Sequence, residues 1–295
     1  MSNFLMKPKI DFAFKEVMMN ENARVGFLSA VLKLKPADVK KTQILNTYLR
    51  KEHEDDKQGI LDVRVSLNND TEIDIEIQLS ELRVWADRSL FYLSKMYTEQ
   101  IKPGQAYNIF KRCVSISILN FDLFQGQKDF YSCFHIREDT RNFLYTDKME
   151  FHVIELTKLP QELKDDSSDI LLWAKFINAE REEEFDMLAT KNTYIKSAYD
   201  TLQVISQDNE KRMEYEAREK AIRDYNQGLL EAEERGWSAG EKVGIEKGIE
   251  TGEYQKAIQI AKNMLAKNFD FDLTAEISGL SVAQIEQLSK EEKIL

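Results

Sequence analysis

Two short segments with strictly alternating polarity constrain the fold of this 295-residue chain more than any other feature. Residues 61–67 and 71–79 place their apolar side chains at every second position, which is the period of a half-buried β-strand. The three residues between them, Asn68, Asn69 and Asp70, are typical of a hairpin turn. The sequence therefore predicts an antiparallel hairpin with one apolar and one polar face.

The length of the turn fixes the register, because a slip of one residue would turn one strand over. In this register Arg64 lies opposite Asp74 and can neutralise it, while Asp62 lies opposite Glu76. Directly opposed carboxylates destabilise a sheet, and a cation is the simplest compensation. Mg²⁺ suits the Asp62–Glu76 pair because it takes one or two carboxylates and keeps water and phosphate at its other positions. The pattern leaves an alternative open, in which the polar face of the hairpin is simply exposed to water and binds no metal.

The remaining periodicity predicts an α/β region followed by helices alone. We expect helices at 10–34 and 85–101 and strands at 42–49, 114–119 and 151–156, whereas only helical spacing follows Pro160. We divide the chain into a domain at residues 1–205, a long helix and glycine-periodic connector at 206–254, and a small helix-turn-helix-like tail at 255–295.

Glycine recurs at every fourth residue in the connector, from Gly236 to Gly252. On a helix this spacing forms a ridge that another helix can approach closely, such as that of a second copy in a homodimer. Each glycine also costs a helix about 1 kcal/mol relative to alanine, so a flexible connector is equally open. The second helix of the tail after it is poor in basic residues, which favours protein contact over reading of a DNA groove.

Composition excludes several classes of protein. Residues 1–160 hold 23 basic and 23 acidic side chains, so the whole net charge of −11 lies in the rest of the chain. The first region can therefore approach a phosphate backbone locally. Three histidines without metal-ligand spacing argue against a zinc hydrolase, and no nucleophile motif is present. Two cysteines, no signal peptide and no membrane span predict a cytoplasmic protein without membrane partners.

The hairpin also resembles a known family. Gly-Ile-Leu-Asp at 59–62 followed by Asp-Ile-Glu-Ile-Gln at 74–78 is similar to the D…E-x-Q signature of the recombination-promoting nuclease/putative transposase family of the PD-(D/E)XK nuclease superfamily. Further similarities lie at 11–15, 91–97, 100–107, 115–119 and 155–159. The resemblance implies a restriction-endonuclease-like α/β core, with a mixed central sheet flanked by helices and an all-helical C-terminal extension.

The resemblance also implies an activity and a catalytic set. It implies a DNA endonuclease hydrolase, dependent on Mg²⁺ or Mn²⁺ and associated with DNA recombination and mobile elements. Asp62 and Glu76 would bind the metal, and Gln78 would orient water or a phosphate oxygen. Gln78 stands where most PD-(D/E)XK enzymes hold a lysine, and a neutral amide cannot replace the charge of that lysine.

Three accessory residues and two rival functions complete the expectations. Asp11 either reaches the site or caps a helix, Lys15 contacts phosphate or is a surface charge, and Arg88 contacts phosphate or pairs with Glu76 or Glu99. The first rival is a catalytically weak or inactive nuclease fold that regulates partners through its helical tail. The second is a strand-transferring transposase, which the absence of a separated Asp, Asp, Glu triad disfavours.

Overall fold

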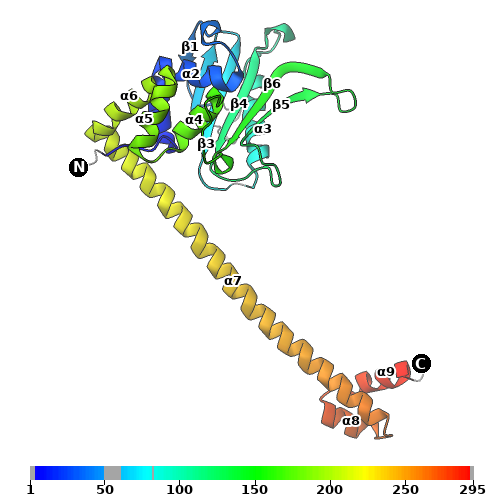
Figure 1. Cartoon of the computed structure of the whole chain (residues 1–295). Coiled ribbons are helices and arrows are strands. Elements are labelled where there is room, and N and C mark those ends of the chain that lie inside the picture. Colours follow the sequence, from blue (N-terminus) through cyan, green and yellow to red (C-terminus); the bar gives the residue numbers. More distant parts are fainter. Residues whose placement is uncertain (1–3, 50–60, 82, 293–295) are drawn as a thin grey trace. The chain divides into compact units, whose positions relative to one another are not determined.

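The structure is a computed structural model that describes residues 4–49, 61–81 and 83–292 (Figure 1). It divides into two compact units, Met1–Arg223 and Asp224–Leu295. In the described part of the chain, no helix is both long and apolar enough to cross a membrane.

The first unit is built on a six-stranded sheet with the strand order β1-β2-β3-β4-β6-β5. β3 pairs with β4 and β4 with β6 in parallel, whereas the other three pairs are antiparallel. The expected mixed sheet is therefore present. Its strands are β1 (Thr42–Ile44), β2 (Val63–Leu67), β3 (Thr71–Gln78), β4 (Arg112–Leu119), β5 (Tyr131–Arg137) and β6 (Leu144–Glu155).

The predicted register of the β2–β3 hairpin is confirmed. Val63 pairs with Ile75, Arg64 with Asp74, and Leu67 with Thr71. The turn has positive φ at Asn68 and Asn69, 51° and 63°, a conformation that asparagine tolerates better than most residues. Alternation along the strands thus sends the apolar side chains to one face of the sheet and the acidic ones to the other.

Helices cover both faces of the sheet (Figure 1). The isoleucines and valines of β2–β4 form the main core with α1, α2, α4, α5 and α6, while Tyr92, Leu93 and Met96 of α3 pack on the opposite face. The expected flanked α/β core is confirmed. The helices are α1 (Asp11–Met19), α2 (Glu21–Leu32), α3 (Trp85–Thr98), α4 (Asp169–Asn178), α5 (Glu182–Lys191), α6 (Thr193–Gln207), α7 (Asn209–Leu265), α8 (Phe271–Ser278) and α9 (Val282–Glu292), with 3₁₀ turns η1 (Pro36–Asp38), η2 (Tyr107–Ile109) and η3 (Leu156–Lys158).

The structure differs from the expected helices and strands at three places. The helix expected at 10–34 is divided at Asn20, whose side chain accepts a hydrogen bond from Ala23 N at 3.1 Å and so starts α2. The strand expected at 42–49 contains only Thr42–Ile44. Strand β5 was not predicted, because exposed and half-buried residues do not alternate along it.

The second unit begins at Asp224 and contains most of α7 together with α8 and α9. Ala261, Leu280 and Ile285 form its small core. Ser281 and Gln284 form a capping box, since Gln284 N donates to Ser281 Oγ and Ser281 N donates to Gln284 Oε1. The glycines from Gly236 to Gly252 lie within α7, and a Cβ added at any of the five would meet no described atom within 4 Å.

Candidate active site

Asp62 and Glu76 form an interlocked pair at the end of the hairpin. Asp62 N donates to Glu76 Oε1 at 3.0 Å, and Ile77 N donates to Asp62 Oδ2 at 3.1 Å. Each carboxylate thus accepts a main-chain hydrogen bond from the strand that carries the other. These bonds hold the two acidic side chains in place on the polar face of the sheet.

The environment of the pair disfavours two negative charges. The Glu76 side chain is only 5% exposed. Burial, with the Asp62 charge as the next cause, raises the pKa of Glu76 from 4.5 to about 8. A carboxyl with this pKa holds a proton at neutral pH unless another cation takes the proton's place.

Two basic side chains approach the other oxygens of the pair. Lys15 Nζ, from α1, lies 3.3 Å from Asp62 Oδ1, and Arg88 Nη2, from α3, lies 3.5 Å from Glu76 Oε2. Arg88 also lies over the rings of Trp85 and Tyr92, at 5.5 and 5.1 Å. Lys15 is therefore not an isolated surface charge, and of the two carboxylates expected for Arg88, Glu76 is the one that it reaches.

Asp74 lies on the same face of β3 as Glu76 and is 1% exposed. Burial, followed by the charges of Glu76 and Asp62, raises its pKa well above the ordinary value. Neither of its oxygens has a hydrogen-bond partner among the described residues. Arg64 lies opposite Asp74 as expected, and its charge favours the ionised form of Asp74. The ion pairs of its guanidinium, however, are with Glu72 at 2.7 Å and Glu99 at 3.6 Å.

Gln78 follows Glu76 on the same face at the end of β3. Its Nε2 donates to Ser80 O at 3.1 Å, and the side chain is half-buried. The carboxamide nitrogen carries two N–H groups, so it can keep this bond and still donate to a second oxygen. The main-chain contact fixes Gln78 near the site without joining it to either carboxylate.

Asp11 does not cap α1, since the N-cap residue is Ile10. Its buried carboxylate instead accepts two hydrogen bonds from Arg218 Nε in α7, at 2.9 and 2.7 Å. The hydrogen bond and the charge of Asp11 raise the pKa of Arg218, and the charge of Asp62 raises it further. The structure therefore joins Asp11 to the site's edge through Arg218, a residue that no sequence pattern had marked.

A family comparison covers all of these residues. Residues 8–232 match the family described as PD-(D/E)XK nuclease family transposase. The chain belongs to this family. No curated protein and no solved structure matches the chain. The match agrees with the family that the hairpin resembles, and it extends through the first part of α7, so the family region includes Arg218 as well as the paired carboxylates.

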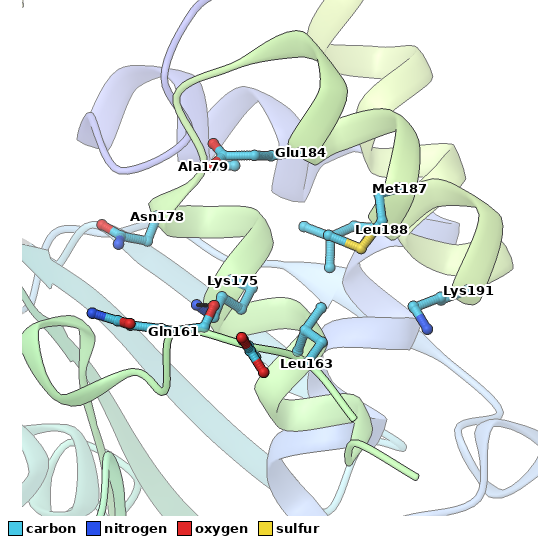
Figure 2. Close-up of a pocket in the computed structure, with 10 residues that line it drawn as sticks. Gln161, Leu163, Lys175, Asn178, Ala179, Glu184, Met187, Leu188 and Lys191 are labelled. Carbon is cyan, nitrogen blue, oxygen red and sulfur yellow. Dashed lines mark hydrogen bonds between the residues drawn. The ribbon is translucent and has the colours of Figure 1, made fainter. Parts of the chain in front are cut away.

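A pocket elsewhere in this nuclease-family chain is lined by different residues from those around the Asp62–Glu76 pair. It has a volume of about 410 Å³ and lies between α4, α5 and the segment that follows η3 (Figure 2). Two of its charged groups already have partners, because Lys175 donates to Gln161 O and Glu184 accepts from two main-chain N–H groups. The Asp62–Glu76 pair is therefore the stronger candidate for catalysis.

Proposed function

We propose that the chain is a metal-dependent DNA endonuclease that hydrolyses phosphodiester bonds and acts in recombination or on mobile elements. The supporting observation is the interlocked pair, in which a buried Glu76 with a pKa of about 8 adjoins Asp62. In such an arrangement two ionised carboxylates would repel each other, and a bound cation would reduce this repulsion. Family membership supports the nuclease class.

The residues present fit a hard divalent cation. Asp62 and Glu76 each use one oxygen for a main-chain hydrogen bond and direct the other toward a basic side chain. Oxygen ligands of this kind suit Mg²⁺ or Mn²⁺. When bound, the ion would polarise the scissile phosphate and lower the pKa of a water molecule.

The other side chains of the site take binding and positioning roles in this proposal. Lys15 and Arg88 would exchange their carboxylate partners for phosphate oxygens of the DNA when a cation takes those partners. Gln78, held through Ser80, would orient water or a phosphate oxygen with its second N–H group. Asp11 and Arg218 would keep α7 against α1 at the edge of the site.

Nicking of supercoiled plasmid tests the proposal. The full-length protein should nick DNA with Mg²⁺ or Mn²⁺ and not with EDTA, and Glu76→Ala and Asp62→Asn should abolish nicking. Glu72→Gln is the matched control, because Glu72 lies on the same strand and face but pairs with Arg64. Because the cation competes with the proton on Glu76, the nicking rate at limiting metal should rise with pH up to about 8 and then level off.

Nicking that persists in Glu76→Ala, or that does not need metal, would contradict the proposal. Failure of the wild type to nick any DNA would favour the second candidate, a regulatory protein with an inactive nuclease fold. A specific observation supports this candidate. Helix α7 exposes Trp237, Ile245 and Ile249 beside the glycine ridge, and these side chains offer a surface for a second copy of the chain.

Light scattering during size-exclusion chromatography tests the homodimer, and Gly244→Glu should convert a dimer to a monomer if the ridge is the interface. Wild-type protein that elutes as a monomer would contradict the dimer. We place the protein in the cytoplasm, where DNA is accessible and its free cysteines stay reduced.

A further inference from the structure

A second cluster of ligand-type side chains lies on the other face of the sheet, at the β5 edge. Antiparallel pairing sets Cys133 opposite His152 and His135 opposite Glu150. The side chains of directly opposed residues point to the same face, so all four gather at one place. Two of the three histidines of the chain and one of its two cysteines are therefore brought together. The sequence did not reveal this because β5 was not predicted.

The side-chain atoms converge on one carboxylate oxygen. Glu150 Oε1 lies 2.9 Å from His152 Nε2, 3.3 Å from His135 Nε2 and 3.5 Å from Cys133 Sγ. Around a tetrahedral Zn²⁺, ordinary metal–ligand lengths place nitrogen, oxygen and sulfur ligands about 3.4–3.6 Å apart. The distances within the cluster are thus close to those between the ligands of one zinc ion. The other oxygen of Glu150 faces the Arg112 guanidinium, which leaves Oε1 directed at the cluster.

Buried His152 has a nitrogen that the protein does not satisfy. His152 is 2% exposed, and its Nε2 has no hydrogen-bond partner among the described residues, although Glu150 Oε1 is close. A protonated Nε2 would be expected to donate to that oxygen. The observed direction of the ring does not allow it, so a proton on Nε2 does not explain the contact.

The opposite nitrogen of the ring contacts Tyr131, and this contact is compatible with the tautomer that a metal-bound histidine needs. The Tyr131 hydroxyl donates to Val31 O at 3.2 Å and lies 2.8 Å from His152 Nδ1. In the tautomer in which the hydroxyl donates to Val31 O, Nδ1 donates to Tyr131, and Nε2 carries a lone pair toward the Glu150 carboxylate. A lone pair facing an anionic oxygen calls for a cation between them. A hydrogen bond on the far nitrogen is also the usual support of a metal-bound histidine.

We propose that Cys133, Glu150 and His152, whose ligand atoms all lie within 4.8 Å of one another, bind a structural Zn²⁺ that joins the edge strand β5 to β6. His135, whose Nε2 lies 3.3 Å from Glu150 Oε1, would supply the fourth ligand. A thiolate and imidazoles favour zinc over the Mg²⁺ proposed for the carboxylate pair. A thiol nucleophile activated by histidine fits less well, because the Cys133 thiol donates to the Glu150 carboxylate, and a thiolate there would repel that carboxylate unless a cation lies between them. The site lies on the α2 side of the sheet, and the Asp62–Glu76 pair lies on the α3 side.

Cobalt substitution of the full-length protein tests the site. After removal of bound metal with a chelator, titration with Co²⁺ should give thiolate-to-cobalt charge-transfer absorption that saturates at one ion per chain, and Zn²⁺ should abolish the absorption. Glu76→Gln and Cys113→Ala should keep the absorption, because the first removes the other candidate metal site and the second removes the other cysteine. Cys133→Ser should lose it.

Thermal unfolding gives a second readout. Chelation should lower the melting temperature of the wild type and leave that of Cys133→Ser unchanged, and the solvent accessibility of Cys133 makes this substitution compatible with folding. The proposal is overturned if wild-type protein gives no cobalt–thiolate absorption, or if Cys133→Ser keeps the absorption. Neither result depends on whether the protein cuts DNA.

Discussion

Replacing Glu76 by glutamine should change how the stability of the metal-free protein depends on pH. The ordinary pKa of this carboxyl is 4.5, and in the folded protein it is about 8. Between these values the folded state holds a proton that the unfolded chain has released. Stability of the wild type therefore falls as pH rises through this window. The glutamine variant has no such proton, so its profile should be flatter.

The size of the effect follows from the difference between the two pKa values. About 3.5 pH units at roughly 1.4 kcal/mol per unit give a cost of about 5 kcal/mol above pH 8, where Glu76 is ionised in both states. Glutamine keeps an oxygen that can accept the hydrogen bond from Asp62 N, so the fold around the pair should persist. Near pH 4.5 the two proteins should have similar stability, and the variant should be the more stable at pH 9.

Urea unfolding at several pH values, in EDTA and in Mg²⁺, measures the effect. Saturating Mg²⁺ should restore the stability of the wild type at high pH and should leave the Glu76→Gln variant unchanged, because the cation stabilises only the protein that binds it. Glu72→Gln is the control, and it should keep the steep wild-type fall between pH 5 and 8. Parallel profiles for wild type and Glu76→Gln would refute the reasoning from burial and charge.

Four further substitutions, one of them a control, test other parts of the structure. Asp74→Asn should stabilise the metal-free protein at high pH, because burial raises the pKa of Asp74, and calorimetry showing equal or lower stability at pH 9 would contradict this. Arg218→Ala should cost about 1–3 kcal/mol in urea unfolding by leaving buried Asp11 without its donors, and an unchanged midpoint would count against the contact. Gly26→Ala should lower the melting temperature, since its Cβ would come within 2.2 Å of an α6 side chain, whereas Gly228→Ala, in open space, should raise it slightly.

The alternation of 61–79 was enough to predict the centre of the fold. Polarity at every second residue and a turn of three residues set the β2–β3 register, and the structure has that register. The placement of Asp62 beside Glu76 followed from it. Local pattern succeeded here because the hairpin is a local structure whose two faces have opposite polarity.

Contacts between residues far apart in the sequence were not predicted. The Arg218–Asp11 pair joins side chains 207 residues apart, and no periodicity marks either partner. Strand β5 lies at the sheet edge, so its side chains do not alternate between core and solvent. Without β5 the approach of Cys133 to His152 could not be seen, and the histidines were judged by their sequence spacing alone.

The division of the helix at Asn20 was missed for a different reason. The apolar spacing of 10–34 continues through the break, and only the side-chain cap at Asn20 separates α1 from α2. Asparagine is a favoured N-cap residue, so this signal was available in the sequence. The burial of Asp74 could not be predicted, because the alternation places it on the polar face of the hairpin, and only the structure shows that this side chain is buried.

The most direct measurement is calorimetric titration of Mn²⁺ into the full-length protein at pH 8, after zinc has been supplied to occupy any thiolate site. We predict binding to the wild type and to Glu72→Gln, loss of binding in Glu76→Gln and Asp62→Asn, and weaker wild-type binding at pH 6 because the proton on Glu76 competes. Equal Mn²⁺ binding by Glu76→Gln and wild type would contradict the claim that Asp62 and Glu76 form the divalent-metal site.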